Sequence, residues 1–134
     1  MATYASGTFD VTLTPRGQND QSGNSALSRL SIDKTFHGDL EATSKGEMLA
    51  AATAVKGSAG YVALEQVTGM LGGRSGSFVL QHSGTMNRGA QQLSVTVVPD
   101  SGTGPLAGLA GTMMITIVDG KHFYDFEYTL TRNN

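Results

Sequence analysis

Two adjacent glycines in the middle of the chain, Gly72 and Gly73, constrain the fold more than any other feature. They separate two runs of strand-forming residues within the stretch 57–86. Glycine accepts the positive φ angles that a two-residue hairpin turn requires at its central positions. We therefore predict a β-hairpin whose register is fixed by the turn. The facing pairs are Leu71 with Arg74, Val67 with Phe78, Glu65 with Leu80, and Ala63 with His82.

The two faces of this hairpin differ in polarity, because successive side chains of a strand point to opposite sides. One face is mostly apolar and carries Tyr61, Glu65, Val67, Leu71, Phe78, Leu80, His82 and Met86. The other is more polar but still includes Val62, Leu64, Met70 and Val79. An isolated two-stranded ribbon is only marginally stable in water, so further strands have to cover the apolar face.

The rest of the chain supplies further strands. Apolar and polar residues alternate in 8–14, 30–36, 93–97, 106–119 and 121–131. Turn-forming residues separate these runs at 15–25, 37–39, 87–89 and 100–105, and Asp119-Gly120 is a second two-residue hairpin signal. Lysine at position 34 lies in the apolar row of its strand.

The segment from Leu40 to Val55 has two interpretations. Its first half alternates like a strand, whereas Glu47–Lys56 contains strong helix formers followed by Gly57, where a helix would end. Local propensity favours a short helix over 47–56, but the context of a sheet overrides propensity in many proteins. Strand and helix both stay open for these ten residues.

About eight strands joined by mostly short turns can bury their apolar rows in a sandwich or in a closed barrel. Closure removes the exposed edge strands, and eight strands suit a small barrel that is filled by side chains or holds one small ligand. We predict an all-β fold, an eight-stranded antiparallel closed barrel, as one domain over residues 1–134.

Composition excludes several function classes. The chain has no cysteine, and its three histidines are scattered, so we expect no metal site. The Gly-rich segments 72–76 and 101–105 do not precede a helix, so we expect no phosphate-binding cofactor. A net charge of -2 without a basic stripe argues against nucleic acid as a partner. No signal peptide or membrane-spanning run is evident, and we expect a soluble, cytoplasmic protein.

Three phrases of the sequence resemble a known family: GDLE at 38–41, GMLGGRSGSFVLQH at 69–82 and SGTGPLAGL at 101–109. Together they resemble a bacterial family of uncharacterised proteins whose fold is similar to the allene oxide cyclase barrel. The resemblance implies an eight-stranded antiparallel barrel. It implies no reaction, because the family has no established activity and a fold alone does not transfer one.

The candidate site lies on the apolar face of the central hairpin. Glu65 and His82 are diagonal neighbours there, and a carboxylate that orients an imidazole is a minimal general acid/base pair. The alternative is a buried pair that only satisfies its own hydrogen bonds. Lys34 is either an interior cation for a carboxylate ligand or a lysine whose ammonium reaches water at a strand end. We also expect Tyr61, Phe78 and Tyr124 to contact a ligand.

Three functions follow as hypotheses. The first is binding of a small, mostly apolar ligand in the barrel cavity. The second is an isomerase or cyclase that uses Glu65 and His82 as acid and base. The third is a packed barrel that acts through an oligomer surface. The apolar residues on the outward face of the hairpin predict a homo-oligomer, most simply a dimer.

Overall fold

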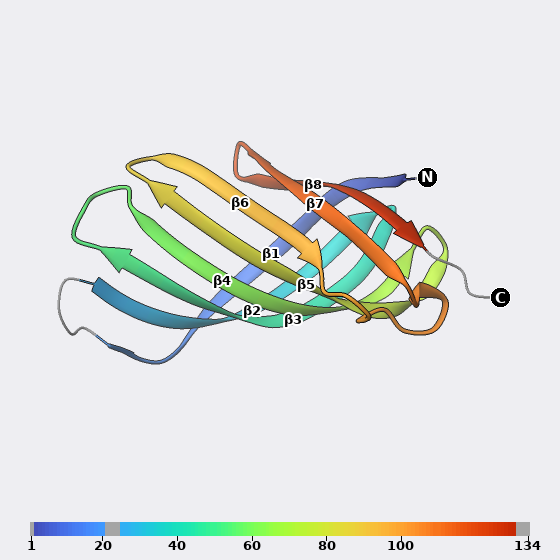
Figure 1. Cartoon of the computed structure of the whole chain (residues 1–134), viewed down its shortest axis with the longest axis horizontal. Helices are drawn as coiled ribbons and strands as arrows, with labels where there is room; N and C mark the ends of the chain where they lie inside the picture. The colour runs from blue at the N-terminus through green and yellow to red at the C-terminus, as the bar shows by residue number, and fades with distance from the viewer. Residues whose placement is uncertain (1, 21–24, 131–134) are drawn as a thin grey trace.

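Eight antiparallel strands, each hydrogen-bonded to the next in sequence, close into a barrel when the last strand pairs with the first (Figure 1). The computed structural model describes residues 2–20 and 25–130. The elements are β1 (Thr3–Asp20), β2 (Ser25–Gly38), β3 (Leu40–Thr53), β4 (Ala59–Leu71), β5 (Arg74–Asn87), β6 (Ala90–Val97), the 3-10 turn η1 (Gly104–Leu106), β7 (Leu109–Val118) and β8 (Lys121–Leu130). The predicted all-β, eight-stranded antiparallel closed barrel is confirmed.

The β4–β5 hairpin has the predicted turn and register. Gly72 and Gly73 have φ angles of 57° and 84°, which favour glycine at both turn positions. Each of the four predicted facing pairs is present. Asp119 and Gly120 also form a turn with positive φ angles, between β7 and β8.

β3 is a strand along its whole length, so the helix alternative for 47–56 is wrong. Every residue of β3 from Ala42 to Ala52 has a partner in β2 and another in β4. A helix at this point would leave both neighbouring strands without a partner. The pairing therefore outweighs the helix propensity of the alanine-rich run.

Two predicted boundaries are wrong. The loop at 15–25 is shorter, because β1 continues to Asp20, and residues 21–24 lie outside the described residues. Pro15 and Arg16 still pair with Leu30 and Arg29, although the register becomes irregular after Arg16. The strand expected at 106–119 begins only at Leu109. Thr131, the last residue of the final predicted strand, also lies outside the described residues.

The start of β7 is displaced by η1. Gly104 and Gly108 have φ angles of 56° and 82°, which a regular strand does not contain. The chain turns between them and places Leu106 in the core, where it is 1% exposed. This turn covers one end of the barrel.

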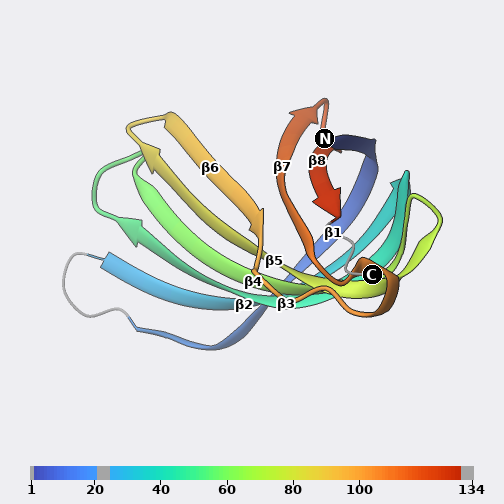
Figure 2. The same ribbon diagram turned by 45° about the vertical axis from the view of Figure 1, so that its right-hand side comes forward.

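The two ends of the barrel are built differently. At the end that contains the turns 38–40 and 71–74, the interior is filled by a core of large side chains. At the other end β6 and β7 diverge, as Figure 2 shows, and within the described residues Thr96 and Thr112 are their one register pair. We call these the closed end and the open end. No helix in the described part of the chain is long and apolar enough to cross a membrane.

Candidate functional site

Four buried polar side chains form a layer across the barrel interior: Lys34, Ser44, Glu65 and His82. They come from the four consecutive strands β2, β3, β4 and β5. All four are at most 8% exposed. Alternation along each strand points them inward, between the core of the closed end and the open end. We call them the charge layer.

The carboxylate of Glu65 is the centre of the charge layer. Its Oε2 accepts a hydrogen bond from Lys34 Nζ at 2.7 Å and another from His82 Nε2. Its Oε1 accepts from Ser44 Oγ at 2.6 Å. Three donors from three strands therefore converge on one carboxylate. Within the described residues no buried side-chain nitrogen or oxygen lacks a hydrogen-bond partner.

Gly46 lies directly opposite Glu65 and allows this convergence. A Cβ atom at Gly46 would lie 2.6 Å from the Cα atom of Glu65 and would also collide with the carbonyl oxygen of Leu64. Any larger residue would push β3 and β4 apart at this pair. The glycine thus keeps Glu65 within reach of the donors on both sides.

These contacts decide the ionisation of Glu65. Burial by itself would raise the pKa of the carboxyl, but the hydrogen bond from His82 and the charge of Lys34 outweigh it and hold the pKa at about 2. Glu65 is therefore an anion at neutral pH. With so low a pKa it does not take up a proton at neutral pH, so it acts on His82 as an orienting group and not as a base.

Lys34 is an interior cation, and the alternative that its ammonium reaches water at a strand end is wrong. Its side chain is 6% exposed, and Nζ also lies 4.7 Å from the centre of the Phe9 ring. Lys34 is placed mid-strand, with partners in both β1 and β3, and not at a strand end. Its counter-ion is Glu65 of the same chain.

A cavity of about 410 Å³ occupies the open end of the barrel beyond the charge layer. Its wall consists mainly of small and apolar residues, and none of the described residues that line it carries a charge. The lining residues are Ser28, Met48, Ala50, Ala51, Ala52, Ala59, Gly60, Tyr61, Gly84, Thr85, Met86, Gln91, Gln92, Leu93 and Ile117. The cavity adjoins the charge layer, because Gly84 is the next inward-facing residue of β5 after His82.

Tyr61 is the one titratable residue of this wall. Its ring lies over Gly84, its partner on β5: a Cβ atom there would be 2.5 Å from Cε1 of the ring. Burial raises the pKa of the Tyr61 hydroxyl, and the negative charge of Glu65 raises it further. The hydroxyl is therefore protonated at neutral pH and able to donate a hydrogen bond.

Of the five residues expected to contact a ligand, Tyr61 alone lines this cavity among the described residues. Glu65 and His82 lie in the charge layer, and His82 lines the second of the two grooves described below. Phe78 is 1% exposed and stacks on Phe126 with ring centres 6.0 Å apart. The hydroxyl of Tyr124 accepts a hydrogen bond from the Leu40 amide at 2.9 Å and lies 3.0 Å from the carbonyl oxygen of His37, to which it donates. Both belong to the packed core. The structure thus pairs Glu65 with His82 in the charge layer, places Tyr61 in the cavity wall, and leaves Phe78 and Tyr124 in the core.

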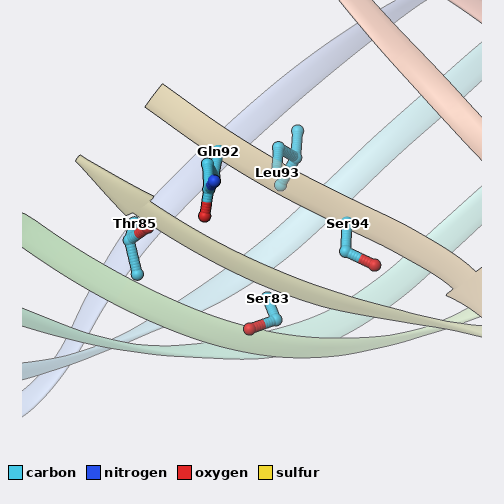
Figure 3. Close-up of a pocket in the computed structure, with 5 residues that line it drawn as sticks. All are labelled: Ser83, Thr85, Gln92, Leu93 and Ser94. Atoms are coloured by element: carbon cyan, nitrogen blue, oxygen red, sulfur yellow. The ribbon is translucent and has the colours of Figure 1, made fainter. Parts of the chain in front are cut away.

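Two grooves lie on the outside of the barrel. The groove over β5 and β6 has a volume of about 490 Å³ and is lined by Ser83, Thr85, Gln92, Leu93 and Ser94 (Figure 3). It holds hydroxyl and amide groups but no titratable side chain. A second, of about 500 Å³, contains the exposed apolar residues Leu49, Val62 and Leu64. The second groove is also lined by Arg29, Glu47 and His82, so its wall includes charged groups and one member of the charge layer.

The sequence interpretation missed Ser44 and most of the cavity wall. Ser44 lies in the inward-facing row of β3 together with Ala42. Alternation along the strand identifies it as an inward residue once β3 is known to be a strand. The wall residues Ala50, Met86, Leu93 and Ile117 follow the same alternation. Their small size or exposed position gives no separate signal in the sequence.

Comparison with known proteins places the chain in a family. The model of a family described as "Protein of unknown function (DUF3224)" matches residues 5–128. The chain belongs to the DUF3224 family. The chain is similar to a DUF3224 protein of unknown function from Shewanella oneidensis MR-1, whose crystal structure is known, with 54% sequence identity. The match covers 99% of this chain and 100% of the Shewanella chain, and the two structures superimpose with a TM-score of 0.94. No curated protein of known function matches.

Proposed function

We propose that this protein binds a small, mostly apolar molecule in the open-end cavity. The observation that carries the proposal is a space of about 410 Å³ with a mainly apolar wall that includes the partly buried hydroxyl of Tyr61. Pockets for small molecules have volumes of roughly 300–1,000 Å³ and combine apolar walls with a few polar groups. The cavity meets both criteria.

The charge layer supports this proposal as a rigid floor. Its hydrogen bonds tie β2, β3, β4 and β5 to one carboxylate directly beneath the cavity. Walls that are already held in place lose little conformational freedom when a ligand binds, and this favours affinity. The large core at the closed end leaves the open end as the part of the interior that can accept a ligand.

Binding is tested with N-phenyl-1-naphthylamine, a neutral apolar dye whose fluorescence rises in an apolar site. We expect the wild-type protein to enhance its fluorescence saturably, and Ala50→Phe, which fills the cavity, to weaken binding at least 10-fold. Leu64→Ser is the matched control, because Leu64 is 54% exposed on the outer face. It should bind the dye like the wild type. No saturable binding, or a loss in Leu64→Ser but not in Ala50→Phe, contradicts the proposal.

A second candidate function is proton transfer by His82. Its Nε2 donates to Glu65, and its side chain, which is 5% exposed, lines the groove that also contains Leu49, Val62 and Leu64. A carboxylate-oriented imidazole is suited to general acid/base catalysis. An isomerase or cyclase activity that uses Glu65 and His82 stays a prediction, because the family and its Shewanella structure are both described as having unknown function.

Proton transfer is tested without knowledge of the substrate. A base beside a bound ketone would accelerate exchange of the protons next to the carbonyl of 2-octanone for deuterium in D₂O, which NMR measures directly. We expect His82→Gln to abolish the acceleration if His82 is that base. Exchange in the presence of wild-type protein that is no faster than in buffer removes the enzyme hypothesis and leaves binding intact.

The homodimer also stays a prediction. Val62, Leu64 and Met70 are 54%, 54% and 46% exposed on the outward face of β4, and Val79 lies on the same face of β5. Burial of this surface against a second copy would remove exposed apolar area from water. Sedimentation of the wild-type protein and of Leu64→Ser at micromolar concentration tests it. A wild-type protein that sediments solely as the 14.0 kDa species contradicts it.

A further inference from the structure

The chemistry of the cavity wall points to one class of ligand. Building on the binding function proposed above, we propose that the cavity selects uncharged molecules that present a hydrogen-bond acceptor, such as a ketone, aldehyde or ester with an alkyl chain. It discriminates against the carboxylate and the amine of the same chain. Tyr61 is the residue that recognises the acceptor.

The first argument is the absence of charge in the wall. None of the described residues that line the cavity is an acid, a lysine, an arginine or a histidine. An ion that enters an apolar site loses its hydration and has to find a counter-ion there to compensate. The wall offers none to an ion of either sign. An uncharged ligand has no such cost.

The second argument is that the nearby charges are already paired. Lys34 Nζ lies 2.7 Å from Glu65 Oε2, and the two side chains are 6% and 0% exposed. A carboxylate ligand that sought Lys34 would have to displace Glu65 and leave that carboxylate buried without its cation. Removal of one partner from a buried ion pair is strongly unfavourable. Lys34 is therefore not an anchor for an acidic ligand.

The third argument concerns the donor. Tyr61 has its ring fixed over Gly84, and its hydroxyl makes no hydrogen bond to a described residue. Burial and, to a smaller extent, the Glu65 charge raise the pKa of this hydroxyl, and the same charge would repel an anion placed against it. A neutral carbonyl oxygen accepts from the hydroxyl without that penalty. The Tyr61 hydroxyl therefore favours a ligand with a neutral hydrogen-bond acceptor and disfavours a ligand that places a negative charge at the same position.

The remaining polar residues of the wall have a different position. Gln91 and Gln92 are exposed at the mouth, where water competes for them. Thr85 is also exposed. Ser28 is half-buried opposite Ala50 and can donate or accept, so it adds no preference between acceptors and donors. Tyr61 is therefore the group whose removal should change selectivity.

The experiment compares 2-octanone, octanoate and octylammonium as competitors that displace N-phenyl-1-naphthylamine at pH 7.5. We expect 2-octanone to compete at least 10-fold more strongly than either ion. Tyr61→Phe should weaken competition by 2-octanone about 3- to 10-fold, measured relative to the dye's affinity for the same variant. Ser94→Ala, in the groove over β5 and β6, is the control outside the cavity and should leave competition by 2-octanone within 2-fold.

The outcomes separate this inference from the binding function. If the dye binds but octanoate or octylammonium competes as well as 2-octanone, the selectivity is refuted and binding stands. If Tyr61→Phe leaves competition by 2-octanone unchanged, Tyr61 does not recognise the acceptor and the inference is refuted in that form. If the dye does not bind the wild-type protein at all, both proposals fail.

Discussion

The two ends of the barrel use the same strands and the same alternation but place different residues inside. At the closed end, Phe36, Phe126 and Val67 are completely buried, and aromatic rings contact one another. At the open end, the inward positions carry alanine and glycine, and the large residues Leu93 and Ile117 remain 44% and 61% exposed. The charge layer separates the two regions.

This difference indicates that the two ends of the barrel have different roles: packing at the closed end stabilises the fold, and the space at the open end is available for a ligand. Close packing of large apolar side chains supplies most of the free energy of folding. Small side chains on the same inward rows leave a space that the barrel does not fill itself. We therefore expect substitutions at the closed end to affect stability, and substitutions at the open end to affect binding.

The largest expected effect is at the closed end. Phe126→Ala removes a fully buried ring that contacts both Phe78 and Tyr128 and should destabilise the protein by about 3–5 kcal/mol. Leu93→Ala, at the open end, should cost about 1 kcal/mol or less because Leu93 is 44% exposed. Urea unfolding of both variants measures the contrast. Equal losses would show that the two ends do not differ in packing.

A substitution in the charge layer should lower the free energy of unfolding almost as much as Phe126→Ala does. Glu65→Gln leaves the ammonium of Lys34 buried without its counter-ion, and we expect a loss of about 3 kcal/mol. Glu47→Gln is the matched control, because the Glu47–Arg29 pair is 3.7 Å apart and exposed on the surface. It should change stability by less than about 0.5 kcal/mol. A Glu65→Gln variant as stable as Glu47→Gln would mean that the layer contributes no stability.

The lowered pKa of the Glu65 carboxyl predicts that the stability of the fold depends on pH. The pKa of Glu65 is about 2 in the folded state, below its ordinary value of 4.5. Below about pH 4.5 the unfolded chain therefore takes up a proton that the folded state does not, and stability falls as the pH drops from 4.5 towards 2. The difference between a pKa of 4.5 and one of about 2 corresponds to about 3 kcal/mol in the free energy of unfolding.

The pH dependence is measured as urea midpoints between pH 7 and pH 3. Glu65→Gln lacks this carboxyl, so its midpoint should fall less steeply with acid than that of the wild type. The other carboxyl groups titrate in both proteins and cancel in the comparison. Parallel curves for the two proteins would contradict the lowered pKa.

The smallest of these stability effects concerns His82. Gln in its place can still donate a hydrogen bond to Glu65, whereas Leu cannot. We expect His82→Leu to cost about 1–3 kcal/mol and His82→Gln clearly less, since the leucine variant leaves a buried acceptor with one donor fewer. The denaturant midpoints of the two variants and of the wild type measure this difference in stability. Two variants with unperturbed and indistinguishable midpoints would show that the His82–Glu65 hydrogen bond has no structural role.

The barrel and the centre of the site could be predicted from local signals. Gly72-Gly73 sets the register of β4 and β5, and alternation then puts Glu65 and His82 on the inward face. Lys34 follows in the same way from the apolar row of β2. A two-residue periodicity carries this information because a slip of one residue would turn every side chain to the other face.

The rest depends on pairing that no local signal reveals. Ser44 reaches Glu65 because β3 pairs with β4 in the register that places Gly46 opposite Glu65, and the alternation of β3 alone does not reveal that register. The run after Pro15 looked like loop because it lacks large apolar residues, yet β2 provides a partner for it. Small inward residues such as Ala50 look the same in sequence whether they surround a cavity or permit tight packing. Only the assembled barrel distinguishes the two.

The most direct test of the division between the two ends is an NMR titration of the ¹⁵N-labelled protein with 2-octanone. The account predicts saturable shifts of the amides of Ala50, Tyr61 and Gly84, which line the open-end cavity, and none at Leu40 and Leu71 in the closed end. Shifts spread evenly over both ends, or confined to the outer residues Val62 and Leu64, would contradict it.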